Sequence, residues 1–125
     1  MFAGVGGTLL GCSLCQRKGI GIELSEKYAE IYNQVCEKLN LDKQKMLVGN
    51  SFKLDKILRK NKIKTVDLII TDPPYSNMLS KNKTGEKAKN GNSKATPFTN
   101  SEYDLGNLEY NDFLKALKKI IKESI

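Results

Sequence analysis

Four consecutive residues are suited to binding a flat molecule that bears an NH2 group: Asp72, Pro73, Pro74 and Tyr75. Proline has a fixed φ and no N–H, and it pushes the residue before it into an extended conformation. The Asp72 carboxylate and the Pro73 carbonyl should therefore point outward as two hydrogen-bond acceptors, beside the aromatic face of Tyr75. A nucleobase with an exocyclic amine fits such a site. The structural alternative is that the prolines end a strand and Asp72 caps the segment that follows.

A glycine-rich turn is the second feature that could bind a ligand, and it covers residues 2–8, Phe-Ala-Gly-Val-Gly-Gly-Thr. Glycine lets the backbone turn tightly and approach a ligand closely, and a helix predicted over residues 8–17 would offer unpaired N–H groups at its start. A short strand predicted over residues 19–23 ends in the carboxylate of Glu23, about 20 residues after the turn, where Rossmann-like folds accept from ribose hydroxyls. Alone, the turn could serve only helix packing.

Taken in order, the turn, the acid and Asp-Pro-Pro-Tyr resemble the N4/N6 class of S-adenosylmethionine-dependent DNA methyltransferases. The first motif of that family usually reads Phe-x-Gly-x-Gly-Thr-Thr, and this chain departs from it at Gly7. The resemblance implies that S-adenosylmethionine is the cofactor, that Glu23 holds its ribose, that Leu24 covers its adenine ring and that Asp72 borders it. The turn residues that the resemblance assigns to cofactor binding are Phe2, Ala3, Gly4, Gly6 and Thr8.

A third motif of that family, Gly-Asp-x-x, matches Gly49-Asn50-Ser51-Phe52 in this chain. These residues follow a strand predicted over residues 46–48. There the resemblance implies that the side-chain oxygen of Asn50 accepts from the adenine amine, and that Ser51 and Phe52 line the same slot. The alternative is that Asn50 and Ser51 cap the helix that follows, which residue preferences at helix starts favour equally.

The elements that must position these residues alternate between helices and strands. The apolar run at residues 66–70 is short and rich in β-branched residues, so it is predicted to be a buried parallel strand, and open α/β sheets bind ligands at the carboxyl end of such strands. Helices are predicted over residues 25–39 with Ser25 as the cap, over residues 52–58, and over residues 113–121. The order predicts an α/β fold of the Rossmann-like methyltransferase type. Residues expected in the core from their helical spacing are Tyr28, Tyr32, Val35, Cys36, Leu39, Phe113, Leu114, Leu117, Ile120 and Ile121.

Residues 1–125 are predicted to be one partial methyltransferase catalytic domain. A glycine turn of this kind should follow a strand, yet only Met1 precedes Phe2, and the resembling enzymes continue with further strands after Asp-Pro-Pro-Tyr. The first and last strands of the sheet are therefore expected to be missing, and a fragment of a longer gene product is favoured. Residues 76–107 lack apolar periodicity and are expected to form a long flexible loop that contacts nucleic acid or is simply disordered.

Charge and cysteine usage narrow the class of protein further. The net charge of +7 and the pI near 9.3 suit a polyanionic partner, DNA first and RNA as the alternative. Cations crowd residues 53–64, although such a run is usually a solvated helix face. Three cysteines without a histidine argue against zinc, so no metal is expected, and the cysteines are expected to be small buried hydrophobes. None of them follows a proline, as the nucleophile of carbon-5 cytosine methylation does. No membrane-spanning stretch or leader is recognised, so a cytoplasmic protein is expected.

These features predict methyl transfer from S-adenosylmethionine to the exocyclic amine of a DNA base. Such an amine is a poor nucleophile because its lone pair is delocalised into the ring, and two acceptors can draw the nitrogen toward tetrahedral geometry. Aspartate at position 72 favours N6 of adenine over N4 of cytosine, by analogy with the family. An RNA base amino-methyltransferase and a non-catalytic remnant or assembly partner are the alternatives. The rest of the catalytic domain, or a specificity domain or subunit, is an expected partner.

Overall fold

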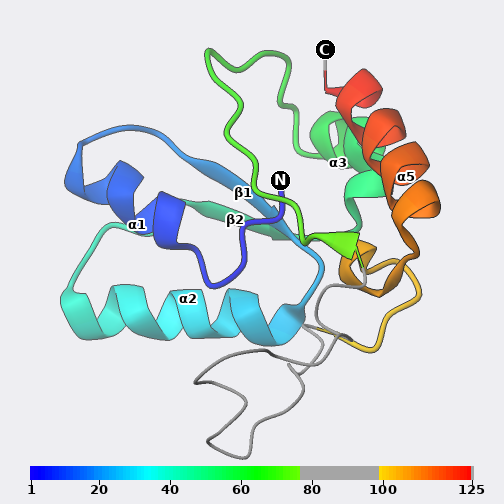
Figure 1. Cartoon of the computed structure of the whole chain (residues 1–125). Helices are drawn as coiled ribbons and strands as arrows, with labels where there is room; N and C mark the ends of the chain where they lie inside the picture. Colours follow the sequence, from blue (N-terminus) through cyan, green and yellow to red (C-terminus); the bar gives the residue numbers. More distant parts are fainter. Residues whose placement is uncertain (77–98, 125) are drawn as a thin grey trace, which may run out of the picture. The chain divides into compact units, whose positions relative to one another are not determined.

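The computed structural model describes residues 1–76 and 99–124 (Figure 1). The chain divides into two compact units, residues 1–72 and residues 73–123. The first unit contains the helices α1 (Gly7–Leu14), α2 (Glu26–Leu39) and α3 (Leu54–Lys60), the 3-10 helix η1 (Ser51–Lys53), and the strands β1 (Ile20–Glu23) and β2 (Lys45–Val48). The described part of the second unit contains the 3-10 helix η3 (Leu105–Asn107) and the helix α5 (Tyr110–Glu123).

β1 and β2 form a two-stranded parallel sheet, in which Glu23 pairs with Val48. The helix α2 connects the two strands, so this part of the chain is a βαβ unit and the α/β class is confirmed. Ser25 caps α2 as predicted, because its Oγ accepts a hydrogen bond from the Tyr28 N–H at 3.4 Å. The helix ends at Asn40, which adopts the left-handed conformation typical of a C-terminal cap.

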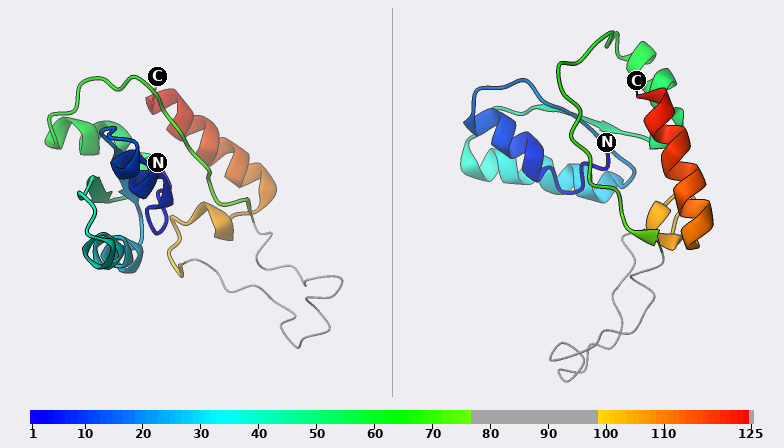
Figure 2. Two further views of the ribbon diagram at one scale, coloured as in Figure 1. Left: turned by 90° about the vertical axis from the view of Figure 1, so that its left-hand side faces the viewer. Right: turned by 45° about the horizontal axis from the view of Figure 1, so that its top comes forward.

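The core of the first unit lies between the sheet and two helices. Figures 1 and 2 show α1 and α2 on the same face of the sheet, and Leu9 of α1 packs there with Tyr32 and Cys36 of α2 and with Met46 of β2. Gly21 of β1 makes this approach possible, since a Cβ atom at that position would lie only 2.8 Å from Cδ1 of Leu9. Gly21 therefore allows α1 to sit close against the sheet.

Tyr32 is the largest buried side chain of this core, and its environment gives a pH-dependent prediction. The side chain is fully buried, and its phenolic oxygen accepts a hydrogen bond from the Gln44 backbone N–H at 2.7 Å. Burial raises the pKa of Tyr32 from 10.0 to about 12. The unfolded chain releases this proton first, so the stability that the neutral phenol contributes is present below pH 10 and is lost as the pH rises through 12.

We therefore expect Tyr32→Phe to show a smaller fall in unfolding free energy between pH 10 and 12 than the unchanged protein. The variant should also lose about 1 kcal/mol at every pH because the Gln44 N–H loses its acceptor. Urea unfolding at a series of pH values measures both effects, with Tyr110→Phe, which removes an exposed hydroxyl, as the control. An unchanged pH slope in Tyr32→Phe would contradict the raised pKa.

The strand expected over residues 66–70 is not formed, and this prediction is wrong. The structure assigns no strand there, and the apolar side chains expected to be buried are exposed, with Leu68 at 72%. The predicted buried parallel strand is instead an irregular segment that leads from the end of α3 to Asp72. Apolar, β-branched composition expresses only a local preference, whereas a strand also needs a neighbouring strand to pair with.

The edge of β1 that faces away from β2 is not available to that segment, because residues at the start of the chain bond to it. Alternate residues of a strand direct their carbonyls to the same edge, and the Glu23 carbonyl points toward β2. The Ile22 carbonyl points to the opposite edge and accepts from the Ala3 N–H at 3.0 Å. The residues that enter the glycine turn thus lie along this edge. Thr71, which directly follows the apolar segment, donates from its Oγ1 to the Met1 carbonyl at 3.5 Å.

The helices predicted from apolar spacing are formed, but their buried faces are narrower than expected. Expected core residues that are buried are Tyr32, Cys36, Phe113 and Ile120. Expected core residues that are exposed are Leu39, Leu114 and Ile121. A helix at the surface of a small domain buries only one stripe, so residues at the border of the predicted apolar face are exposed to solvent. The first helix also ends at Leu14, earlier than residue 17.

Asp104 organises the described part of the second unit. The carboxylate is almost completely buried, and its Oδ1 accepts from the Gly106 N–H at 2.9 Å. Its Oδ2 accepts from the backbone N–H of Thr99 at 3.0 Å and from the hydroxyl of the same residue at 2.8 Å. Residues 99–107 are therefore hydrogen-bonded, which corrects the expectation of a structureless loop up to residue 107. The rest of that predicted loop, residues 77–98, lies outside the described residues.

Candidate functional site

The glycine turn has an unusual concentration of left-handed backbone conformations. Phe2 has φ of 55°, Gly4 has φ of 55° and Gly6 has φ of 81°. Glycine adopts such angles at little cost, whereas a bulky side chain there costs on the order of 1 to 3 kcal/mol. The Gly6 N–H donates to the Ala3 carbonyl at 2.9 Å, and Gly6 is the N-cap of α1. The chain therefore turns sharply from the edge of β1 into the helix.

Two glycines of this turn have opposite surroundings. A Cβ atom on Gly6 would lie 2.3 Å from Cδ2 of Tyr32, so the turn rests directly on α2. A Cβ atom on Gly4 would meet nothing within 4 Å, so a ligand can approach the backbone there. Thr8, in the first turn of α1, is exposed to solvent. Sequence reasoning classed Tyr32 only as a core residue, and its support of the turn could be seen only in the folded chain.

Glu23 ends β1 directly beside the turn and is 8% exposed. Its Oε2 accepts from the Gly4 N–H at 2.7 Å, and its Oε1 accepts from the Ser25 N–H at 2.9 Å. One carboxylate thus joins the glycine turn, the end of β1 and the start of α2. A carboxylate has about four lone-pair sites, so both oxygens can accept a further hydrogen bond. The structure therefore brings together the two features that the sequence placed about 20 residues apart.

We expect Glu23→Gln to lower the free energy of unfolding by about 2 kcal/mol. The amide keeps the shape of the carboxylate but has one oxygen, so one of the two backbone N–H donors would face an NH2 group. Urea denaturation measures the change. Glu30→Gln, at an exposed position of α2, is the matched control and should stay within about 0.5 kcal/mol of the unchanged protein. Equal losses in both variants would contradict the bridging role of Glu23.

The segment after β2 reaches the same edge of the sheet as Glu23, because parallel strands in register end together. Leu24 leaves the sheet there from β1 and is half-buried. Oδ1 of Asn50 accepts from the Phe52 N–H at 2.9 Å and caps η1, and Ser51 is buried. The capping alternative for Asn50 is thus confirmed. The capping bond uses one of the two lone pairs of that oxygen, and binding of an adenine amine by Asn50 stays a prediction.

Asp-Pro-Pro-Tyr is divided between the two units, since Asp72 ends the first and Pro73 begins the second. The Asp72 side chain is exposed in its unit. In the second unit Tyr75 is exposed and both prolines are half-buried. A Cβ atom on Gly106 would lie 3.3 Å from Cβ of Pro74, so Pro74 packs closely against η3. The second proline therefore has a packing role, while the acid and the aromatic ring bordering it are accessible to solvent.

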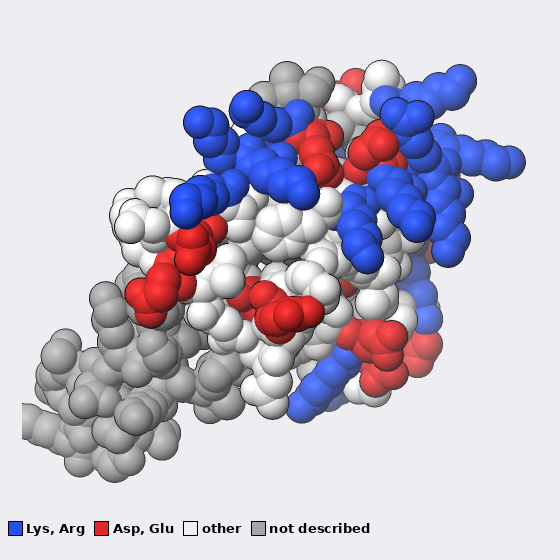
Figure 3. Space-filling view, turned by 90° about the vertical axis from the view of Figure 1, so that its right-hand side faces the viewer, with Lys and Arg blue, Asp and Glu red and all other residues white. Residues whose placement is uncertain are grey.

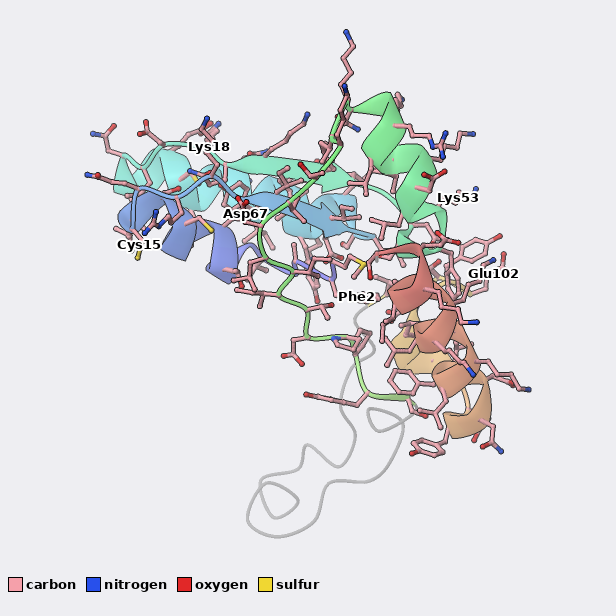
Figure 4. The ribbon with its side chains drawn as sticks, turned by 90° about the horizontal axis from the view of Figure 1, so that it is seen from above. Phe2, Cys15, Lys18, Lys53, Asp67 and Glu102 are labelled. Carbon is pink, nitrogen blue, oxygen red and sulfur yellow. The ribbon has the colours of Figure 1, made fainter. Side chains whose placement is uncertain are left out.

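Among residues 1–76 and 99–124, no group of three or more His, Cys, Asp or Glu side chains could hold a metal ion. The cysteines were expected to be small buried hydrophobes. This is confirmed for Cys36, which is buried, and wrong for Cys15, which is exposed at the end of α1 (Figure 4); Cys12 is half-buried. Within the same described ranges, no helix combines the length and the apolar character needed to cross a bilayer.

Comparisons with protein-family models, with curated proteins and with solved structures found no match. A functional assignment for this chain therefore depends on the chemistry of its own motifs and on the geometry of the turn, the acid and the edge of the sheet.

Proposed function

We propose that this chain binds S-adenosylmethionine as part of an amino-methyltransferase that acts on the exocyclic amine of a DNA base, with N6 of adenine as the target. The observation that carries the proposal is the pair of hydrogen bonds by which Glu23 joins Gly4 and Ser25. An acid with spare acceptor sites, at the carboxyl end of a parallel strand and beside an open glycine turn, has the acceptors that a ribose diol requires.

A Rossmann-like methyltransferase fold is part of the proposal, and the lateral order of segments in the first unit supports it. β2 pairs with β1, and residues 1–3 lie along the opposite edge of β1. Thr71 contacts the Met1 carbonyl, so the segment that ends in Asp72 comes next in this order. In open α/β sheets, ligands bind outside the carboxyl ends of such neighbouring segments. Asp72 and the glycine turn would then border one ligand.

The residues at this edge fit the adenosine part of the cofactor. Gly4 and Gly6 allow close approach of the backbone, and Glu23 would accept from the ribose hydroxyls. Leu24 and Phe52, both half-buried, would cover the two faces of the adenine ring. S-adenosylmethionine, when bound, supplies an electrophilic methyl group on a positively charged sulfur. The strained φ of Phe2 supports a functional turn, because such strain is concentrated at ligand-binding sites.

Asp72, the Pro73 carbonyl and Tyr75 would act on the nucleobase. The two oxygens accept the two N–H bonds of the amine, which draws its lone pair out of conjugation with the ring and fixes its direction. Tyr75 stacks on the base, which has to leave the duplex at a cost of a few kcal/mol, and stacking returns about 1 to 3 kcal/mol of that cost. No covalent intermediate with the protein is required.

Isothermal calorimetry with S-adenosylmethionine tests the cofactor assignment, with NAD as the control because it shares the adenosine part but lacks the sulfonium. Binding of NAD alone would overturn the proposal. Transfer of labelled methyl groups to duplex DNA, compared with ribosomal and transfer RNA, then tests the substrate. Transfer to RNA alone would replace the DNA assignment, and cofactor binding without any transfer would favour a non-catalytic remnant or assembly partner.

A further inference from the structure

Residues 53–64 carry six cations and one acid, a dense positive charge within a chain of net charge +7. We define the α3 basic surface as the six exposed side chains of Lys53, Lys56, Arg59, Lys60, Lys62 and Lys64. Of these six side chains, only Arg59 has an ion-pair partner among the described residues, with its Nε 2.7 Å from Oδ1 of Asp55. The five lysines make no such pair in the part of the chain that the structure describes. The surface therefore has a large uncompensated charge.

The cations of α3 extend along the helix and do not converge on one point. Lys56 and Lys60 are one helical turn apart on the same side of α3, and Lys53 precedes Lys56 by three residues. A rise of about 1.5 Å per residue puts neighbours in this row about 5 Å apart along the axis. Figure 3 shows many Lys and Arg side chains on one face of the protein, with Asp and Glu side chains among them. Such a row matches a repeating polyanion better than a single phosphate group.

The apolar side of α3 is already used inside the protein. Leu54 is buried, and Cδ1 of Ile57 would lie 2.7 Å from a Cβ atom on Gly49, so the helix packs tightly on the residue that follows β2. A helix that lies on a membrane surface needs an apolar face for the lipid. Because α3 has no such face available, a nucleic-acid backbone fits this surface better than a bilayer. The same packing fixes the basic surface beside the sheet edge that holds Asn50.

Lys62 occupies a backbone position that favours glycine. Its φ is 57°, its N–H donates to the Arg59 carbonyl at 3.0 Å, and the Ile63 N–H donates to the Leu58 carbonyl at 3.0 Å. This pattern is a Schellman motif, in which the left-handed residue after the helix is usually glycine. A lysine there is strained, although its charge also interacts favourably with the helix C-terminus. The motif ends α3 at this point and fixes the backbone from which the Lys62 side chain extends.

We propose that the α3 basic surface binds the phosphate backbone of the nucleic acid that the enzyme methylates. The inference rests on the proposed function for the identity of the substrate, and it assigns substrate contacts to residues outside Asp-Pro-Pro-Tyr and the cofactor turn. Lys53, Lys56 and Lys60 contact successive phosphates, and Lys62 and Lys64 extend the contact beyond the helix. Contacts of this kind position the substrate without reading its sequence.

Charge reversal in the full chain tests the proposal. The variant Lys56→Glu/Lys60→Glu should bind a fluorescent DNA duplex about tenfold to a hundredfold more weakly at low salt, and its affinity should depend less on salt, with a log–log slope smaller by about two. Lys118→Glu/Lys122→Glu, at exposed positions of α5, makes the same change in net charge and is the control. Equal loss of affinity in both double variants would overturn the proposal, because net charge alone would then explain binding.

The variant Lys62→Gly distinguishes the effect of the Lys62 charge on DNA binding from the effect of its left-handed φ on stability. Glycine relieves the strain, so the variant should unfold at a higher temperature and yet bind the duplex about threefold more weakly, through the loss of about one phosphate contact. A higher unfolding temperature with unchanged DNA affinity would show that Lys62 belongs only to the helix cap and would remove it from the surface.

The same variants show whether the basic surface or the methyltransferase proposal fails. They also distinguish nucleic acid from an anionic membrane as the ligand of the surface. Intact S-adenosylmethionine binding with no effect of the α3 variants on DNA affinity would overturn the basic surface alone. DNA binding that depends on α3 without any cofactor binding would overturn the methyltransferase alone. Vesicles of phosphatidylserine and phosphatidylcholine are the third probe. Loss of vesicle binding in the α3 variants, with DNA binding unchanged, would replace nucleic acid by a membrane surface and overturn the proposal.

Discussion

Replacing Asp72 by Ala is expected to lower methyl transfer by about a hundredfold to a thousandfold and to leave S-adenosylmethionine affinity almost unchanged. The carboxylate is proposed to accept one N–H of the target amine, an interaction that strengthens as the nitrogen becomes tetrahedral. Loss of an interaction made mainly in the transition state lowers the rate and the ratio kcat/KM together. Asp72 is exposed in its unit, and urea unfolding of the variant separates any change in stability from the change in rate.

Asp67→Ala is the matched control for this change. Asp67 is an exposed acid five positions earlier in the same irregular segment (Figure 4), and both variants change the net charge equally. Labelled methyl transfer and calorimetric cofactor binding are measured for both variants, in the preparation in which the unchanged protein shows transfer. If Asp72→Ala kept a normal rate, or if Asp67→Ala lost as much, the role assigned to Asp72 would be wrong.

Replacing Gly6 by Ala is expected to lower the free energy of unfolding by about 3 kcal/mol or more. Two costs add at this position: a left-handed φ of 81°, which costs a non-glycine residue about 1 to 2 kcal/mol, and a contact of 2.3 Å between the new Cβ and Cδ2 of Tyr32, which forces the core to shift. Small domains have a total stability of about 5 to 15 kcal/mol, so the loss is severe. Urea unfolding followed by circular dichroism measures it.

Variants at two neighbouring glycines distinguish the cost of the left-handed φ from the cost of the close contact with Tyr32. Gly4→Ala has a positive φ but open space around the new Cβ, so it should lose only about 1 kcal/mol of stability while lowering cofactor affinity, because the methyl group would fill the approach to the turn. Gly7→Ala, at the start of α1 with open space and no left-handed φ, should be neutral or stabilising by up to about 1 kcal/mol. A similar loss in all three variants would contradict the close contact between Gly6 and Tyr32.

The sequence by itself determined the features that depend on neighbours along the chain. Ser25 and Asn50 could be recognised as caps because each bonds an N–H two or three residues away. The helix α2 and the two short strands followed from local spacing, and together they required a parallel βαβ unit. The glycine turn was recognisable because only glycine tolerates its angles at low cost.

Only the tertiary structure decided what depends on residues distant in sequence. The 66–70 segment has the composition of a buried strand, yet a strand exists only where another backbone offers its hydrogen-bonding edge, and residues 1–3 take that edge of β1. The bond between Glu23 and Gly4 and the support of Gly6 by Tyr32 likewise join separate elements. Spacing along the chain indicated which groups could meet, but packing between elements fixed their distances, and binding and stability depend on those distances.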